Sequence, residues 1–263
     1  MPFLDKDGIA LHYESIAGAA RPIVFIHGWC CDHTFFAPQA AYFAALGHRI
    51  IAPDLRGHGQ SAKPEQSYPI AAFADDIVWM CRELNVKRPI LVGHSMGGII
   101  AFDIATRYPD LPAAIAMLDA AIVLPDAARA AVPVFLESLE GPDPAKALRD
   151  FVGTVFFIPT DDPDRKRRIL DVMAKAPQHV MVSAYRGLAD YNAETTPSRV
   201  AVPSLYIVAD EPSARTDMAR LQMLIPDLHI GRTVGSGHFC QLEVPDQVNA
   251  MLSRFIATAV LPD

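Results

Sequence analysis

The sequence predicts an α/β protein whose mostly parallel sheet is covered by helices on both faces. Short apolar runs typical of buried strands alternate with segments in which apolar residues recur at helical spacing, and this alternation indicates parallel strands. The length of 263 residues suits one large domain with an insertion better than two full domains. We therefore expect a single α/β core interrupted by an inserted segment.

The elements of the core follow one another along the chain. Residues 3–4 and the alternating apolar residues of 9–13 flank a turn at 5–8, which predicts a hairpin of two edge strands. Buried strands are expected at 23–26, 49–53, 89–92, 113–118, 204–208 and around 231–234. Helices are expected at 35–46 and 70–84, from 98 onward, near 218–224 and from 245 to about 259.

The alternation of strands and helices stops between residue 121 and about residue 199. Four helical patterns follow one another there, at 126–139, 144–157, 163–175 and 177–188. We expect 121–199 to form a helical cap inserted into a core made of 1–120 and 200–263. Such a cap would lie over the carboxyl ends of the strands, where open α/β sheets bind ligands, and would supply much of a substrate pocket.

The charge balance argues against polyanionic partners. Lysine and arginine number 23 against 30 aspartates and glutamates, so the formal net charge of −7 leaves no basic footprint for nucleic acid or an anionic membrane. The dense basic cluster at 165–168 follows aspartates at 161, 162 and 164, and we expect it to be a solvated helix face. Because neither a targeting pattern nor an apolar stretch of membrane-spanning length occurs, a cytoplasmic protein is expected.

Neither a metal nor a cofactor is expected. The four cysteines have no metal-ligand spacing, and the adjacent Cys30 and Cys31 could bond to each other only through a strained ring, so free thiols are expected. The glycines at 57–59 and 97–98 do not form G-x-G-x-x-G after the first strand of a βαβ unit, so no dinucleotide fingerprint is present.

The sequence G-H-S-M-G at 93–97 stands between a predicted strand and a predicted helix. This is the context in which G-x-S-x-G forms a sharp turn that holds a serine, here Ser95, with its hydroxyl exposed above the sheet. The backbone N–H of Met96 then lies at the start of the helix, where the helix dipole favours negative charge and a developing oxyanion can be bound. The motif predicts that Ser95 is a nucleophile.

Three further motifs, taken with this one, carry a family resemblance. They read H-G-W at 27–29, D-L-R-G-H-G-Q-S at 54–61 and G-S-G-H-F at 235–239. In this order and spacing the chain resembles the α/β-hydrolase superfamily over nearly its whole length, with the cap least similar. The resemblance implies a mostly parallel eight-stranded α/β-hydrolase sheet with helices on both faces and an inserted helical cap.

The resemblance also implies the partners of Ser95. His238 would be the general base that takes the serine proton and returns it to the leaving group, which a serine hydroxyl needs because it is a weak nucleophile alone. The oxyanion hole would pair the N–H of Met96 with that of Trp29. His94, His27 and His58 are expected to be structural supports.

The triad acid departs from the usual pattern of the superfamily. Members commonly carry an aspartate in the loop after the strand that corresponds to 204–208, but Pro212 occupies that site here. A subset resembling certain haloalkane dehalogenases takes its acid from the end of the strand after the elbow helix, where Asp119 stands. We favour Asp119, with Asp210 and Glu211 as the alternatives, because only geometry decides which carboxylate reaches the histidine.

The leading functional prediction is acyl transfer to water, with a small-molecule carboxylic ester or lactone bearing an apolar acyl part as substrate. A serine nucleophile argues against hydrolytic dehalogenation, which needs an attacking carboxylate. Amide or carbon–carbon bond hydrolysis, perhydrolysis and hydroxynitrile cleavage remain open on the same framework, and a non-catalytic small-ligand receptor is the alternative from another class. Candidate pocket residues are Trp29, Cys30, Met96 and Phe239 from the core, and Phe135, Phe151, Phe156, Met181, Tyr185 and Leu188 from the cap.

Overall fold

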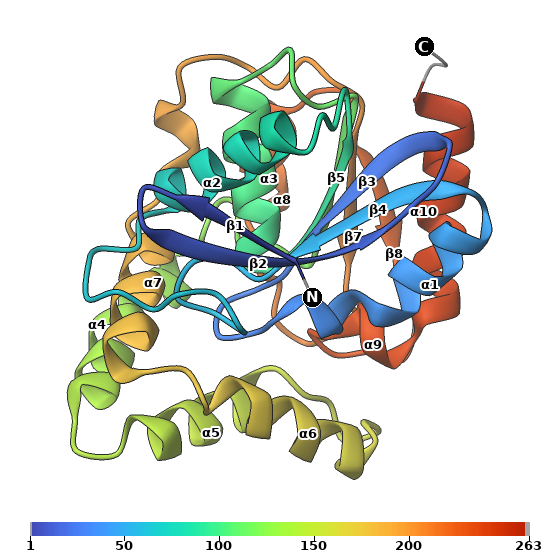
Figure 1. Ribbon diagram of the computed structural model, residues 1–263. Helices are drawn as coiled ribbons and strands as arrows, with labels where there is room; N and C mark the ends of the chain where they lie inside the picture. The colour runs from blue at the N-terminus through green and yellow to red at the C-terminus, as the bar shows by residue number, and fades with distance from the viewer. Residues whose placement is uncertain (1, 261–263) are drawn as a thin grey trace.

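An eight-stranded sheet runs through the computed structural model, which describes residues 2–260 (Figure 1). Its strand order is β1-β2-β4-β3-β5-β6-β7-β8. The pairs β1–β2 and β2–β4 are antiparallel and all the others are parallel, so the predicted mostly parallel sheet is confirmed. The strands are β1 (Phe3–Lys6), β2 (Ile9–Ile16), β3 (Ala20–Ile26), β4 (His48–Pro53), β5 (Ile90–His94), β6 (Ala114–Leu118), β7 (Ser204–Val208) and β8 (His229–Arg232).

The two central strands are buried along their whole length. Every residue of β5 and β6 is buried, and their parallel register sets Val92 opposite Ala116. Such strands read as continuous apolar runs because helices cover both faces of the sheet. The last strand runs from His229 to Arg232 instead of 231–234, since these are the residues that pair with Leu205–Val208 of β7.

Two helical layers cover the sheet (Figure 1). One layer contains α2 (Ile70–Glu83), α3 (Met96–Arg107) and α8 (Met218–Leu224). The other contains α1 (Ala37–Ala45) and α10 (Pro245–Ala259), with the short helices η1 (His33–Phe36) and α9 (Cys240–Glu243) beside them. Each layer packs its own apolar cluster against the sheet, so the core is divided into two by the strands.

Four helices separate β6 from β7 in the chain. They are α4 (Asp126–Glu140), α5 (Pro144–Val155), α6 (Pro163–Met173) and α7 (Gln178–Ala189), followed by the short η2 (Ala193–Thr195). We call this part the helical insertion; in Figure 1 it lies below the sheet and its two layers. The side chains of Asp143 and Asp162 cap α5 and α6 by accepting hydrogen bonds from the N–H groups of Lys146 and Arg165.

The helix expected at 144–157 ends at Val155 in the structure. Phe156 and Phe157 leave the helix, and their rings approach those of His238 and Phe239 of the core. We call residues 156–162, which join α5 to α6, the strap. Helical periodicity alone could not predict this end, because the tertiary contacts of the two rings outweigh the local preference for helix.

Two further observations bear on the nature of the molecule. All four cysteines are free and buried, as expected from their spacing. Within residues 2–260, the helices lack the combination of length and apolarity that a membrane span requires.

Candidate active site

Ser95 lies in a sharp turn between β5 and α3. Its φ of 54° and ψ of −121° belong to neither helix nor strand, and such a conformation persists only where the surrounding packing imposes it. A Cβ on Gly93 would lie 2.1 Å from the carbonyl oxygen of Gly97, and a Cβ on Gly97 would lie 2.0 Å from that of Ile26. Only glycine at both positions therefore lets β3, β5 and α3 approach closely enough to hold Ser95 in this conformation.

His238 follows β8 and forms a buried pair with Asp119. Its Nδ1 lies 2.7 Å from Oδ2 of Asp119, which comes directly after β6 and adopts a φ of 45°. The other oxygen of Asp119 accepts a hydrogen bond of 3.2 Å from the backbone N–H of Ala209, after β7. Because Nδ1–H donates to the carboxylate, Nε2 of His238 is left to accept a proton.

Burial and nearby charges set the protonation of this pair. Burial lowers the pKa of His238 below its ordinary value of 6.5, the positive charge of Arg215 lowers it further, and Glu211 acts in the opposite direction. Burial raises the pKa of Asp119, while hydrogen bonding and the charge of Arg215 limit that rise. A neutral imidazole next to a carboxylate is the state in which His238 can accept a proton.

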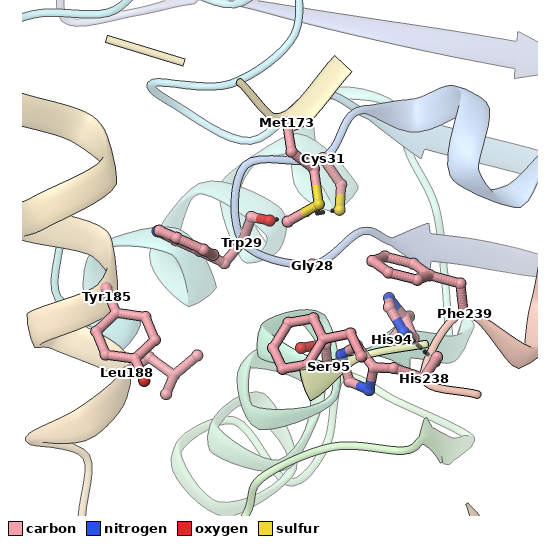
Figure 2. Close-up of a pocket in the computed structure, with 11 residues that line it drawn as sticks. Gly28, Trp29, Cys31, His94, Ser95, Met173, Tyr185, Leu188, His238 and Phe239 are labelled. Atoms are coloured by element: carbon pink, nitrogen blue, oxygen red, sulfur yellow. Dashed lines mark hydrogen bonds between the residues drawn. The ribbon is translucent and has the colours of Figure 1, made fainter. Parts of the chain in front are cut away.

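Ser95 and His238 face the same small cavity, which Figure 2 shows in close-up. Its volume of about 30 Å³ holds little more than one or two water molecules. The side chains around it come from the core, from α6 and α7, and from the strap. They belong to Gly28, Trp29, Cys31, His94, Ser95, Phe156, Met173, Tyr185, Leu188, His238 and Phe239.

Five of the ten predicted pocket residues line this cavity, namely Trp29, Phe239, Phe156, Tyr185 and Leu188. Among the other five, the prediction is wrong for Cys30 and Met96, and the cap candidates Phe135, Phe151 and Met181 do not line the cavity either. Phe135 and Phe151, for example, stack on each other with ring centroids 3.8 Å apart. An apolar helix face in the sequence indicates that the face is covered, but it does not indicate by which element. Here α4 and α5 cover each other.

The sequence did not point to Met173 and Cys31 as cavity residues. Met173 is the last residue of α6 and is 1% exposed. A second cavity of about 210 Å³ adjoins this region: Cys31 lines both cavities, and Val172, the neighbour of Met173, lines the second. Cys31 and the end of α6 thus contribute to both cavities.

Two backbone N–H groups are close to Ser95. Met96 is the first residue of α3, and Trp29 follows Gly28, where an added Cβ would lie 3.1 Å from the Cβ of Ser95. Within residues 2–260 neither N–H donates to another backbone group. The indole Nε1 of Trp29 donates to the carbonyl of Met181 at 2.9 Å, so this loop is also attached to α7.

The other histidines near the site act as supports, as expected. His94 is buried, and its Nε2 donates to the carbonyl oxygen of His238 at 2.8 Å. His27 accepts a hydrogen bond of 3.0 Å from the N–H of Leu55. His58 donates from Nδ1 to the carbonyl of Arg56 at 2.8 Å. These bonds fix the loops that carry the H-G-W, D-L-R-G-H-G-Q-S and G-S-G-H-F motifs.

The two alternative carboxylates differ in position. Asp210 is exposed and accepts a hydrogen bond of 2.9 Å from the N–H of Gly235, away from the cavity. Glu211 lies beside Asp119 and His238, with candidate ligand atoms of the three side chains within 4.8 Å of one another. Burial and the adjacent Asp119 raise the pKa of Glu211 to about 7, although its ion pair with Arg215 counteracts the rise. The structure therefore brings Asp119 to Nδ1 of the histidine and sets Glu211 behind it.

Arg215 is the charged residue at the site that the motifs did not indicate. Its guanidinium pairs with Glu211, and its Nε lies 3.6 Å from Oδ2 of Asp119. The one available sequence signal was the spacing of Glu211 and Arg215, opposite charges four residues apart. That spacing is common on solvated surfaces, so it could not distinguish a buried site.

Two groups of side chains could in principle ligate a metal ion. One group is Asp119, Glu211 and His238, and the other is His12 on β2, His33 in η1 and Asp54 directly after β4. In each group histidine Nδ1 is already hydrogen-bonded to the aspartate, at 2.7 Å for His238 and at 2.8 Å for both His12 and His33. A nitrogen that donates a proton to a carboxylate has no lone pair for a metal. These arrangements fit hydrogen-bonded histidine–aspartate contacts better than metal ligation.

Comparison with known proteins places these features in a family. The profile of the alpha/beta hydrolase fold matches residues 21–151. The AB hydrolase superfamily protein YisY of Bacillus subtilis is 28% identical over 269 aligned positions, which cover 95% of this chain and 96% of that protein.

Solved structures show the same architecture. The enol-lactonase of Burkholderia xenovorans LB400 superposes with a TM-score of 0.87 at 22% identity, over 97% of this chain and 100% of that one. Est816, described as an N-acyl homoserine lactone degrading enzyme, is 28% identical with a TM-score of 0.79, over 97% of this chain and 100% of its own.

Proposed function

The chain belongs to the α/β-hydrolase superfamily and is an enzyme of the hydrolase class, and from this premise we propose that it is a serine hydrolase of carboxylic esters or lactones. The observation that carries the proposal is the hydrogen bond of 2.7 Å between His238 and Asp119, at the same cavity that Ser95 lines. This arrangement supplies a nucleophile, a base and an acid that orients the base.

The reaction proceeds through an acyl-enzyme. Nε2 of His238 takes the proton of the Ser95 hydroxyl while Oγ attacks the carbonyl carbon of the ester. The tetrahedral intermediate collapses, the carbon–oxygen bond to the leaving group breaks, and the imidazolium returns the proton to the departing alkoxide. Water then attacks the acyl-enzyme with His238 again as base, which releases the acid and restores Ser95. Asp119 stabilises the imidazolium in both halves.

The oxyanion is stabilised by the N–H groups of Trp29 and Met96. Both lie beside Ser95, both lack another backbone acceptor among residues 2–260, and the N–H of Met96 is at the N-terminus of a twelve-residue helix. Donors fixed in this way act without reorganisation during the reaction, and each contributes roughly 10²–10³-fold to kcat in comparable sites.

The substrate is small or has an apolar acyl part. The cavity is about 30 Å³ and its walls are mainly aromatic and aliphatic, with contributions from the strap, α6 and α7. We propose that the helical insertion is a cap that admits the substrate by moving away from the core. The lactone-degrading activity in the description of Est816, which is 28% identical, supports the inclusion of lactones in the substrate class.

The test is covalent labelling of the nucleophile. A fluorophosphonate probe should modify wild-type protein at Ser95, as located by mass spectrometry, and the Ser95→Ala variant should stay unlabelled. The matched control is Ser213→Ala, because Ser213 is exposed and distant in sequence from the elbow; this variant should label like wild type. An unlabelled wild type, or labelling that survives Ser95→Ala, would overturn the proposal.

A further inference from the structure

Arg215 connects four groups around the His238–Asp119 pair. Its guanidinium forms a two-pronged ion pair with Glu211, Nε lies 3.6 Å from Oδ2 of Asp119, and Nη2 donates to the carbonyl of Val155 at 2.6 Å. The guanidinium carbon also lies 4.5 Å from the centre of the Phe156 ring. With a side chain only 13% exposed, Arg215 is part of the site's interior and not a surface ion pair.

The cluster needs a cation for electrostatic reasons. Asp119 and Glu211 are two nearly buried carboxyl groups, with side chains 2% and 5% exposed, beside a histidine that must stay neutral before the reaction. Two buried carboxylates in contact repel each other, so one of them takes up a proton unless a positive charge compensates. Among the contacts of Asp119, Arg215 is the lysine or arginine that supplies this charge.

The same guanidinium also holds the part of the cap that covers the histidine. Val155 ends α5 and Phe156 begins the strap. The centre of the Phe156 ring lies 4.4 Å from that of the His238 ring, and the backbone carbonyl of Phe156 accepts a hydrogen bond of 3.1 Å from the His238 N–H. One side chain therefore contacts both the acid behind the histidine and the wall in front of it.

We infer that Arg215, held by Glu211, is a positioning residue that keeps the Asp119 carboxylate ionised against His238 and couples this pair to the strap through Val155 and Phe156. The kinetic consequences of this inference rest on the proposed function. The effect of Arg215 on the titration of His238 can be measured without turnover. Arg215 does not touch the reacting atoms: it acts through Asp119 and Phe156.

The charge of Arg215 has a direct effect on the titration of His238. The charged or titratable groups that face the imidazole are Asp119 after β6, Glu211 and Arg215 after β7, and His94 at the end of β5, whose ring lies 4.6 Å away. Asp161 of the strap and Glu243 of α9 lie next to the preceding residue, Gly237. Of these groups Arg215 lowers the pKa of His238, so its removal must raise that pKa.

The experiment compares two substitutions that separate charge from shape. Arg215→Gln removes the charge but keeps amide donors for Glu211 and Val155, whereas Arg215→Lys keeps the charge but loses the planar fork and its stacking on Phe156. The pKa of His238 is read by NMR titration of its ring, with the resonance assigned from the spectrum of His238→Gln. Hydrolysis of p-nitrophenyl acetate gives kcat and KM as functions of pH.

We expect Arg215→Gln to raise the pKa of His238 and to move the acidic limb of kcat/KM to higher pH by the same amount. It should also lower kcat by about 10- to 100-fold, the loss typical of residues that orient the ligands of metal sites. Arg215→Lys should keep the titration of wild type and lose less kcat. The matched control is Arg220→Met, which breaks the two-pronged pair of Arg220 with Glu194 at the surface and should change neither quantity.

An unchanged His238 titration in Arg215→Gln, or an equally raised pKa in Arg215→Lys, would overturn the inference. If Arg215→Gln does not fold, a raised pKa of His238 in Arg215→Lys relative to wild type still overturns the inference. A wild type that fluorophosphonate does not label contradicts the serine-hydrolase proposal instead, and the NMR titrations remain readable in that case.

Discussion

At the scale of single residues, the site depends on which carboxylate reaches His238. The usual loop after β7 offers Pro212 at the expected position. Of the two acids before it, Asp210 accepts a hydrogen bond from Gly235, and Glu211 pairs with Arg215 beside Asp119 and His238. Asp119 comes from β6 instead, and its φ of 45° turns the carboxylate toward the histidine. We propose that Asp119 serves as the acid, one strand away from the usual loop after β7, with the histidine–carboxylate contact kept.

Asp119→Asn tests this assignment. The amide keeps the size of the side chain but cannot stabilise the imidazolium and favours the wrong tautomer of His238, so kcat should fall by roughly 10³–10⁴-fold with little change in KM. The control is Asp210→Asn, which should keep nearly all activity. Steady-state hydrolysis of p-nitrophenyl acetate measures both, and a near-normal rate for Asp119→Asn would show that another acid serves the histidine.

At the scale of elements, Asp54 joins three segments of the core. Its carboxylate accepts hydrogen bonds from Nδ1 of His12 on β2, from Nδ1 and the N–H of His33 in η1, and from the N–H of Gln60. Burial favours the neutral form of Asp54, but the bond from His33 and the other donors outweigh it and lower its pKa below 3.8. The hydrogen bond to Asp54 raises the pKa of His33 above 6.5.

Asp54→Asn should reduce the free energy of unfolding by about 3 kcal/mol near pH 6, because it leaves buried donors facing a neutral amide. Because the pKa of Asp54 is lowered, its contribution to the free energy of unfolding is present above pH 3.8 and is lost as the pH falls from that value through the folded pKa. Because the pKa of His33 is raised, the stability from its ion pair with Asp54 is present below pH 6.5. It is lost as the pH rises through the pKa of His33 in the folded protein.

Urea denaturation at several pH values measures this effect. The difference between wild type and Asp54→Asn should be largest between about pH 4 and pH 6.5 and should shrink outside that window. Asp110→Asn, at an exposed position, is the control and should unfold like wild type. A difference that does not vary with pH would contradict the charged pairing.

The end of α6 is the second element with a testable role, because Met173 lines the cavity at Ser95 while its neighbour Val172 lines the larger cavity. Met173→Ala should join the two cavities and shift the ratio of kcat/KM toward longer acyl chains in a series of p-nitrophenyl esters from acetate to octanoate. It should also cost about 2–5 kcal/mol of stability, as for other buried methionines. Met223→Ala, at a position that is 67% exposed, should change neither.

At the scale of the whole molecule, the site lies between two parts of the chain. The sheet and its two layers supply Ser95, Asp119 and His238, while the helical insertion supplies Phe156, Met173, Tyr185 and Leu188. A cavity of about 30 Å³ cannot accept an ester larger than a few atoms without displacement of its walls. We therefore expect the insertion to move when a larger substrate reaches Ser95.

Hydrogen exchange measured by mass spectrometry tests this motion. Amides of α6 and α7 should exchange faster than those of β5 and α3, because local opening involves the insertion and not the central sheet. After labelling of Ser95 with a fluorophosphonate, exchange in α6, α7 and the strap should change, whereas α1 and α10 on the opposite layer should exchange as before. Equal exchange in the insertion with and without the label would argue for a site that is open without cap movement.

Sequence alone predicted much of the architecture because the signals are local. The continuous apolar runs at β5 and β6 indicated strands covered on both faces, and the glycines at 93 and 97 indicated a turn that only small residues permit. The run of helical patterns after Asp119 corresponds to α4–α7. Element types and their order follow from periodicities within a few residues, and these are carried by the chain itself.

The tertiary structure decided what depends on distance between remote segments. It brought Asp119 rather than Asp210 to His238, placed Arg215 between two carboxylates and the strap, and put Met173 instead of Phe135 at the cavity. No pattern along the chain encodes these contacts, because an apolar or charged side chain has the same local signal whichever partner it meets. The sequence determined the fold and the order of the reactive residues along the chain. The folded structure decided which neighbouring side chains change their pKa values, because burial and charge act through space.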